Sequence, residues 1–206
     1  MAIITNYATL QTAISDNLHR SDLAAGTLQG FINLAEARLR EDLRVREMES
    51  TVDVTISAQT AALPSGYIGL RRFYLNTSPT VLLTYLTPDV FWATYASSTT
   101  SRPLAFTMEA GNFVFGPTPD ITYTGKALIY SLVGLDETNP SALLTSNPNI
   151  YLYASMIEAA AHLDNDALAQ KYGLLYREAL KSKKTSNQKD RAGSQALRAR
   201  PIAGVR

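Results

Sequence analysis

Apolar side chains recur at every third or fourth position through the first part of the chain, the spacing that gathers them on one face of an α-helix. Asn6 is a favourable helix cap and the polar residues 19–22 interrupt the pattern, so a first helix is predicted between them. Its predicted apolar face consists of Tyr7, Leu10, Ala13, Ile14 and Leu18.

A second and longer helix follows after a short connection, which predicts that the two helices are antiparallel neighbours. Thr27 is a suitable cap for this helix, although a start at Ser21 or Asp22, with Gly26 inside the helix, fits the same pattern. The predicted apolar face is Leu28, Phe31, Ile32, Ala35, Leu39 and Leu43.

Charged residues on this second helix are spaced for ion pairs along its surface. Glu36 lies four residues before Arg40, and Arg38 lies four residues before Asp42. Residues four apart are neighbours on a helix, so both pairs are expected to form on the side that faces water.

The period of the pattern changes from 3.6 to 2 at Thr51, where apolar and polar residues begin to alternate as in a strand with one buried face. Short segments separated by turn-forming residues predict a small β domain of roughly five or six strands. A short helix is expected within it at Thr87 and Pro88, which suit a cap and the first helical position. The segments from which these five or six strands would form are residues 51–56, 61–63, 70–75, 80–86, 104–109, 113–115 and 122–132.

Helical spacing returns at Asn147 and Pro148, again a cap followed by proline at the first helical position. The stripe predicted for this helix is Ile150, Tyr153, Ala154, Ile157 and Ala161. Residues 164–166 break the pattern and begin a last helix, with the apolar positions Leu168, Tyr172, Leu175, Tyr176, Ala179 and Leu180. We expect this helix to end among the lysines of residues 181–184, because cations interact favourably with a helix C-terminus.

Two helices therefore precede the β region and two follow it. The predicted fold class is α+β: a four-helix bundle formed by residues 1–49 and 146–185, with a small β domain inserted at residues 50–145. Residues 186–206 are expected to form an extended basic C-terminal tail.

Charge is distributed unevenly along the chain of 206 residues. Residues 1–180 contain 11 Lys/Arg and 17 Asp/Glu, a net charge of −6, whereas residues 181–206 contain 8 Lys/Arg and one Asp, a net charge of +7. The polar composition of the basic segment does not support a core of its own. It is either a solvated, frayed terminus or a segment that becomes ordered on a partner. Apolar residues return between arginines in residues 197–206, which favours the second interpretation.

Composition argues against several kinds of catalytic and metal site. The chain has no cysteine, which excludes disulfides and thiol chemistry. Its two histidines, His19 and His162, do not form a metal-binding pair, and we interpret His162 as a surface or packing residue. No nucleophile elbow or phosphate-binding loop occurs, and the Gly125-Lys126 pair falls within a predicted strand. No cofactor or metal is therefore expected.

Two further features have ordinary structural interpretations. Glu36, Glu41, Glu109 and Glu158 could in principle supply a carboxylate pair for hydrolysis, but nothing in the sequence places two of them across a cleft. Most aromatic residues occupy core positions, and an acidic body opposes binding of phosphates. The N-terminus lacks the features of a signal peptide and no apolar run is long enough to span a bilayer, so a soluble protein is expected.

Three segments together resemble the head-tail adaptor (head-completion, or connector) proteins of tailed bacteriophages. The first is a helix of the type "FI..AE..L.R.LR...ME" that leads into a strand; the second is a β region with a "P.P" turn; the third is a pair of closing helices. The resemblance covers about residues 1–185, and its motifs are residues 31–49; residues 63–72, 102–106, 111–112 and 116–120; and residues 147–160 with 172–180.

The resemblance implies a structural protein of the virion neck, made in the host cytoplasm, that forms a twelve-membered ring under the portal protein. Such a ring extends the channel through which genomic DNA passes and offers a docking surface to the next neck or tail protein. The C-terminal segment commonly reaches into the portal in this family. The residues that would bind the portal here are Leu197, Arg198, Arg200, Pro201, Ile202, Val205 and Arg206.

Two functions from other classes remain as alternatives. A virion-associated cell-wall hydrolase would use the scattered carboxylates, and a nucleic-acid-binding module would use the basic C-terminal segment. Zymography tests the first alternative. A gel-shift series over salt tests the second, because binding that depends on phosphate contacts weakens steeply with salt.

Overall fold

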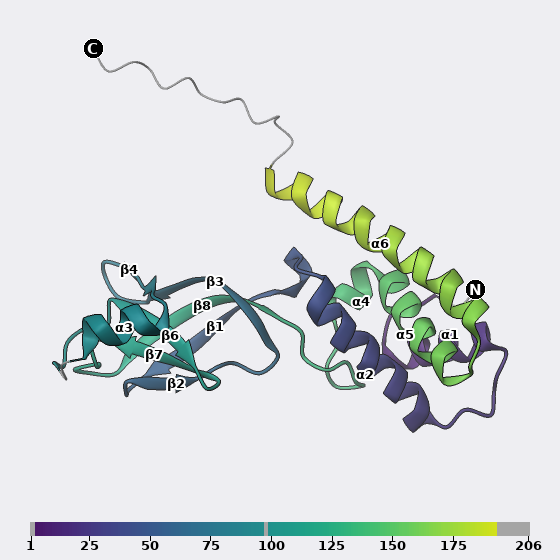
Figure 1. Ribbon diagram of the computed structural model, residues 1–206, viewed down its shortest axis with the longest axis horizontal. Helices are drawn as coiled ribbons and strands as arrows, with labels where there is room; N and C mark the ends of the chain where they lie inside the picture. Colours follow the sequence, from purple (N-terminus) through teal and green to yellow (C-terminus); the bar gives the residue numbers. More distant parts are fainter. Residues whose placement is uncertain (1–2, 97–98, 193–206) are drawn as a thin grey trace, which may run out of the picture. The chain divides into compact units, whose positions relative to one another are not determined.

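The computed structural model describes residues 3–96 and 99–192 of the chain (Figure 1). The fold is α+β, with six α-helices and two small sheets in the described residues. The chain divides into two compact units, one formed by Met1–Glu47 with Gly134–Arg206 and the other by Met48–Val133. We call them the helical unit and the β unit.

Helix α5 lies at the centre of the helical unit. It contacts α1, α2, α4 and α6, and α1 also contacts α2 (Figure 1). Alanines at positions 154, 159 and 160 of α5 are fully buried, which allows neighbouring helices to approach closely. The helices of this unit are α1 (Tyr7–Leu18), α2 (Ala25–Asp42), α4 (Ala142–Ser146), α5 (Pro148–His162) and α6 (Asp166–Ala192).

The stripe predicted for α5 is only partly correct. Ile150 and Ala154 are buried, but Tyr153 and Ile157 are only half-buried and Ala161 is exposed. Because α5 is covered by helices from several directions, its buried residues are spread around the helix instead of forming one stripe. The specific packing of a four-helix bundle stays a prediction, and the short helix α4 is an addition to it.

The start of α1 confirms the predicted cap. The Asn6 side chain accepts a hydrogen bond from the Thr9 backbone N–H at 2.9 Å, and Thr9 bonds back to the Asn6 backbone. The predicted cap of α2 is wrong: α2 begins at Ala25, and its N-cap residue Ala24 makes no side-chain cap bond. Gly26 lies inside the helix, as in the alternative, although the helix starts later than Ser21 or Asp22.

Two expectations for the surface of α2 are also wrong: Glu36 does not face water, and Arg38 does not pair with Asp42. Glu36 is only 2 % exposed, and its carboxylate accepts hydrogen bonds from the backbone N–H of Leu135 and the hydroxyl of Tyr151. Arg38 pairs with Glu158 of α5, at 2.5 Å between Nη2 and Oε1. This face of α2 meets other parts of the helical unit, so its polar side chains find partners there instead of along their own helix.

The β unit consists of two four-stranded sheets. The first has the strand order β1-β8-β3-β4, and the second has the order β2-β7-β6-β5. The strands of the first sheet are β1 (Glu49–Ile56), β3 (Tyr67–Leu75), β4 (Val81–Leu82) and β8 (Tyr123–Ser131). Those of the second are β2 (Thr60–Ala62), β5 (Thr84–Tyr85), β6 (Ala105–Glu109) and β7 (Asn112–Gly116).

The described residues contain eight strands instead of the five or six that we predicted. The predicted strand at residues 80–86 is divided at Leu83, where the chain passes from the first sheet to the second. The short 3-10 helix Arg46–Met48 precedes β1. The predicted short helix is α3 (Pro88–Tyr95), with Pro88 at its first position, although Thr87 makes no side-chain cap bond.

Aromatic rings fill the core of the β unit. Phe73 of β3 packs against Phe106, Phe113 and Phe115, with ring centroids 4.9 to 5.7 Å apart. Gly125 of β8 makes room for this cluster, because a Cβ there would lie 2.6 Å from the Phe73 ring. The core interpretation of these aromatic residues is therefore confirmed.

Helix α6 is longer than predicted. It continues past the lysines at 181–184 to Ala192, so residues 186–192 of the expected extended tail are helical. The cause is a set of contacts near its C-terminal end, described below.

Candidate interaction surfaces

All the residues predicted to bind the portal lie outside the described part of the chain. These are Leu197, Arg198, Arg200, Pro201, Ile202, Val205 and Arg206. The structure describes the segment that leads to them, helix α6, and the contacts that hold this helix.

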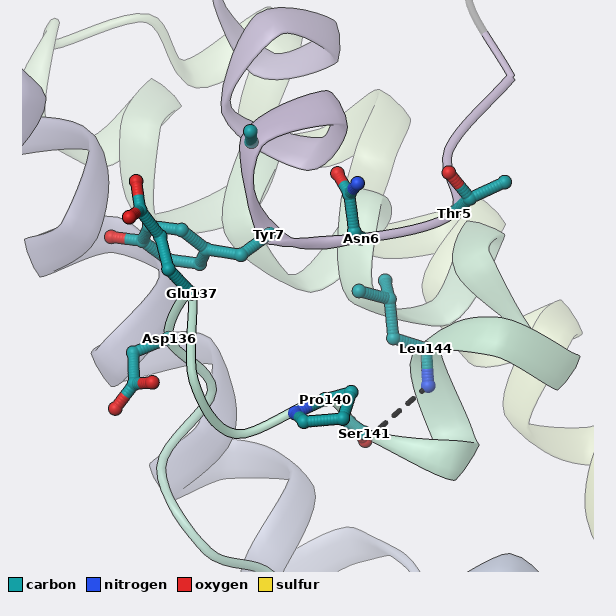
Figure 2. A pocket seen from close by; sticks show the side chains of 9 residues that line it. Thr5, Asn6, Tyr7, Asp136, Glu137, Pro140, Ser141 and Leu144 are labelled. Carbon is teal, nitrogen blue, oxygen red and sulfur yellow. Dashed lines mark hydrogen bonds between the residues drawn. The ribbon is translucent and has the colours of Figure 1, made fainter.

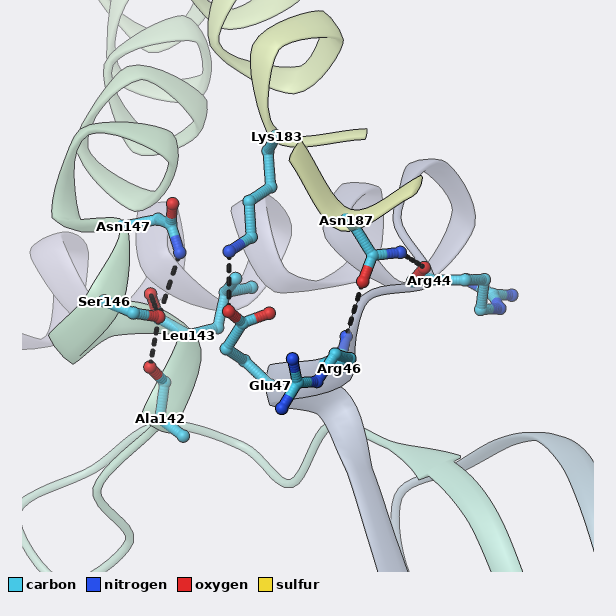
Figure 3. Close-up of polar contacts among 9 residues, drawn as sticks. All are labelled: Arg44, Arg46, Glu47, Ala142, Leu143, Ser146, Asn147, Lys183 and Asn187. Carbon is cyan, nitrogen blue, oxygen red and sulfur yellow. Dashed lines mark hydrogen bonds and ion pairs between the residues drawn. The ribbon is translucent and has the colours of Figure 1, made fainter. Parts of the chain in front are cut away.

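An ion pair fixes α6 near residue 183. Lys183 Nζ donates to Glu47 Oε1 at 2.6 Å, and the Lys183 side chain is largely buried (Figure 3). Burial of Glu47 opposes its ionisation, but the hydrogen bond and the charge of Lys183 outweigh burial and hold the pKa of Glu47 below its ordinary value. The lysine that we expected at a free helix end is therefore a structural contact.

Asn187 makes a second contact one turn further along α6. Its Oδ1 accepts a hydrogen bond from the Arg46 backbone N–H at 3.2 Å, and its Nδ2 donates to the Arg44 carbonyl at 3.4 Å (Figure 3). Asn187 is only 8 % exposed although its neighbours in sequence are polar. One amide thus satisfies two backbone groups of the segment between α2 and β1, and it holds the last turns of α6 against this segment.

A buried polar network joins α2, α5 and the loop after β8. Glu36 Oε1 accepts from the Leu135 N–H at 2.9 Å and from the Tyr151 hydroxyl at 3.2 Å. The Tyr151 hydroxyl also lies 3.1 Å from Ser141 Oγ. Burial raises the pKa of Glu36 above its ordinary value, and burial together with the Glu36 charge raises the pKa of Tyr151. Glu36 is only 2 % exposed and does not line the three pockets that the structure describes, so we interpret the network as structural.

A pocket opens beside the N-terminus of α1. It is lined by residues 5–8 and by the loop that contains Asp136, Glu137 and Ser141, and Figure 2 shows Glu137 beside the Tyr7 ring. The two carboxylate oxygens of Asp136 accept hydrogen bonds from Thr138 and Asn139 of the same loop. These hydrogen bonds lower the pKa of Asp136 to about 2. Burial, then the charges of Glu137 and Asp136, raise the pKa of Tyr7.

The other carboxylates considered for hydrolysis either bind different partners or are exposed. Glu158 pairs with Arg38, Glu109 accepts a hydrogen bond from the Trp92 indole N–H at 2.8 Å, and Glu41 is exposed. Over residues 3–96 and 99–192, no group of three or more His, Cys, Asp or Glu side chains is arranged to hold a metal ion.

The two histidines and the Gly125-Lys126 pair have structural roles. The ring of His162 packs on that of Phe31, with centroids 5.3 Å apart, which confirms its packing role. His19 terminates α1 in the left-handed conformation. Gly125-Lys126 lies in β8, where Lys126 bonds to Asp53 of β1 at 2.6 Å.

The β unit has an open apolar groove between its two sheets. The groove runs along residues 67–73 of β3 and is also lined by Leu82, Tyr85 and Met108. The Tyr67 hydroxyl donates to the Met108 sulfur at 3.2 Å across it. Leu82 and Tyr85 are 62 % and 49 % exposed, which is high for apolar side chains that lie next to a core.

Comparison with known families identifies the chain as a whole. The family model described as SU10 adaptor protein matches residues 5–200, which includes both units. The chain belongs to the SU10 adaptor protein family. This is a family of phage head-tail adaptors, so the resemblance inferred from the motifs is confirmed. A search of curated proteins found no match.

Membership of the SU10 adaptor family implies the role of a structural head-tail adaptor in the virion, with portal and tail proteins as its neighbours. The family match ends within the segment that we predict to bind the portal and includes Leu197, Arg198 and Arg200. None of the described helices is both long and apolar enough to cross a membrane.

Proposed function

We propose that this SU10-type adaptor forms a ring beneath the phage portal, continues the DNA channel, and presents a docking surface to the next neck or tail protein. The proposal rests on the match of residues 5–200 to a head-tail adaptor family. This match extends over both the helical unit and the β unit and is not limited to one of them. The twelve-fold number is an expectation from the resemblance.

Residues 197–206 are proposed as the portal-binding segment. Four apolar residues alternate with three arginines there, so apolar anchors can enter a groove while guanidinium groups pair with carboxylates of the portal. The segment begins five residues after Ala192, the last residue of α6, and the C-terminal part of α6 is held by Asn187 and Lys183. A fixed helix end reduces the freedom that the segment loses when it docks, which favours binding.

The charge distribution supports passive contact with DNA. Residues 1–180 carry a net charge of −6, which disfavours tight binding of phosphates along a channel that DNA must traverse. The positive charge is concentrated in residues 181–206, which include the three arginines assigned to the portal, Arg198, Arg200 and Arg206. A nucleic-acid-binding module would instead need its basic residues on a surface that faces DNA.

We also propose that the protein has no catalytic activity. The family is one of adaptors, and the carboxylates that a hydrolase would use have structural partners or lie apart from one another. Zymography on peptidoglycan tests this point. Lysis that is lost in Glu36→Gln, Glu109→Gln or Glu158→Gln would contradict it.

Co-sedimentation with portal rings of the same phage tests the proposed function. The full chain is expected to migrate with the portal through a density gradient. The variant R198E/R200E is expected to bind more weakly, with a salt dependence smaller than that of a DNA-binding protein because part of the affinity is apolar. The matched control is K181E/K184E, which reverses two exposed lysines earlier on α6 and should bind normally. Absence of the full chain from the portal fractions would contradict the proposal.

A further inference from the structure

Strand β1 is a long and regular sheet edge. It pairs with β8 over all eight residues from Glu49 to Ile56 without a register shift, and it is the terminal strand of its sheet. In the described part of the chain, no strand pairs with its other side. Half of its backbone N–H and C=O groups therefore point outward, and such an edge is suited to pair with a strand of another chain.

The opposite side of the same sheet has a second open edge. Strand β4 covers β3 only at Tyr74 and Leu75, and the Leu83 N–H bonds to the Phe73 carbonyl. Residues 67–72 of β3 extend beyond this cover, a length of roughly 20 Å at the usual rise per residue. The apolar groove lies along the same residues, so a strand added here would also cover exposed apolar surface.

The two edges carry opposite charges on one face of the sheet. Asp53 of β1 pairs with Lys126 of β8, and Lys126 lies opposite Tyr74 of β3, so these side chains form a row across the sheet. Arg72 lies over the Tyr74 ring, with its guanidinium carbon 5.5 Å from the ring centroid. The acidic residue is thus at the β1 edge and the basic residue is at the β3 edge.

Both charges are available to a partner. The Asp53 side chain is 61 % exposed although one of its oxygens bonds to Lys126. Arg72 is exposed, and among the described residues no carboxylate pairs with it.

We propose that neighbouring copies of this chain join head to tail through these edges, with the β1 edge of one copy paired to residues 67–72 of the next. The contact places Asp53 of one copy near Arg72 of its neighbour and covers the apolar groove. It deepens the proposed function, because it rests on the ring and names the surface that connects its members.

Strand directions are consistent with a closed ring. Strands β1 and β3 run parallel to each other, since each is antiparallel to β8. Rotation about an axis along the strands preserves their directions, so β1 of one copy would meet β3 of the next as a parallel pair. Each copy contributes two different edges, and this kind of contact generates a ring when the rotation between copies closes, as it must for copies held on a portal ring.

Pairing of two β1 edges about a two-fold axis is the alternative contact. It would give closed dimers and leave the β3 edge and the apolar groove uncovered. It would also bring together two strands that each carry Glu49 and Asp53 and no basic residue, so no ion pair could form between the two strands. The head-to-tail contact is therefore favoured.

Register shifts in β3 explain why the contact should depend on the portal. Pairing of β3 with β8 is irregular between Tyr67 and Gly69 and again between Leu70 and Arg72. Bulges of this kind hinder the addition of an arbitrary strand. We expect the edges to pair weakly in solution and stably when copies are held side by side on a portal ring, where the effective concentration is high.

Cysteine cross-linking tests the contact directly, because the chain has no cysteine of its own. The double variant D53C/R72C is bound to portal rings, recovered from the gradient and oxidised. It is expected to give a ladder of covalent oligomers, whereas D53C alone and R72C alone remain monomeric. A mixture of the two single variants should stop at dimers, since each copy then supplies one thiol. The control T124C/R72C places the first thiol on the central strand β8 and should give no ladder.

The outcomes separate this contact from the proposed function. Cosedimentation of D53C/R72C without any ladder would overturn the edge contact and leave portal docking intact. Dimers of D53C alone would overturn it in favour of the two-fold alternative. If the protein does not bind the portal, docking fails, and D53C/R72C is oxidised at its highest soluble concentration, where disulfides accumulate even from weak pairing: a ladder then supports the contact and its absence overturns it.

Discussion

Glu36 shows how a single residue departs from its pattern. Its spacing to Arg40 is that of a surface ion pair, yet the carboxylate is buried and bonds to the Leu135 N–H and the Tyr151 hydroxyl. A helix pattern indicates which residues share a face, but not which faces other segments will cover. The loop that supplies Leu135 is almost 100 residues away in sequence, so this partner was not predictable from local spacing.

Substitution of Glu36 by glutamine should remove a pH dependence of stability. Burial raises the pKa of Glu36 above its ordinary value of 4.5 in the folded protein. The folded state therefore holds this proton more tightly than the unfolded chain, and stability falls as pH rises above 4.5 and through the folded-state pKa. Each unit of the pKa difference corresponds to about 1.4 kcal/mol.

Urea denaturation at several pH values checks this expectation. E36Q keeps an acceptor oxygen and should be at least as stable as the unaltered protein at pH 8, with the difference shrinking below pH 4.5. E41Q, at an exposed carboxylate of the same helix, is the control and should show no such trend. A loss of stability in E36Q at pH 8 that is absent at pH 4 would show that the ionised form is favoured.

Gly125 offers a second test at the residue scale. A methyl group at this position would lie 2.6 Å from the Phe73 ring and 2.9 Å from Ile56 Cδ1, inside a packed core. Gly125→Ala should lower the free energy of unfolding by about 1–3 kcal/mol, the usual cost of overpacking. Gly69→Ala, whose nearest contact would be 4.0 Å away, is the matched control in the neighbouring strand. Equal stability of the two variants would contradict the packing argument.

At the scale of elements, the ends of helices were predicted where a local signal exists. Asn6 caps α1, and Pro88 and Pro148 occupy the first positions of α3 and α5, because capping groups and proline act within one turn. Alternation likewise predicted β1 and β8. The start of α2 was missed, because Ala24 gives no capping signal.

Elements that depend on distant partners were not predictable in the same way. Residues 80–86 read as one strand, but the chain changes sheets at Leu83, and the sequence carries no turn signal there. The length of α6 was also missed, because the residue that holds its end is a polar Asn187, which is indistinguishable by composition from its exposed neighbours.

Asn187 should be important for the end of α6. Alanine at this position leaves the Arg46 N–H and the Arg44 carbonyl without their side-chain partner, and we expect a loss of about 1–2 kcal/mol in the free energy of unfolding. Gln188→Ala changes the adjacent exposed residue and should have little effect. Chemical denaturation measures both. Equal stability of N187A and Q188A would show that the amide does not hold the helix.

At the scale of the whole molecule, the fold class and the family were predictable because the ordered motifs extend over most of the chain. The candidate portal-binding segment was predicted from composition and resemblance, and it lies outside the described residues. The open edges of the first sheet became visible only in the structure, because edge and central strands show the same alternation in sequence.

Two truncations separate folding from docking. Removal of residues 193–206 leaves every described contact of α6 and should keep the melting temperature within a few degrees of the full chain, on the order of a surface change. It should abolish co-sedimentation with the portal. Truncation after Lys184 also removes Asn187, so it should lower the melting temperature further. Portal binding by the 1–192 variant with unchanged affinity would move the docking surface to the folded units.

Electron cryomicroscopy of the neck of the intact virion tests the central claim most directly. The account predicts that this chain forms a ring immediately beneath the portal, with residues 197–206 in contact with portal subunits and neighbouring copies joined through the first sheet of the β unit. Absence of the chain from the neck, or its location at another part of the virion without contact with the portal, would contradict its assignment as the head-tail adaptor.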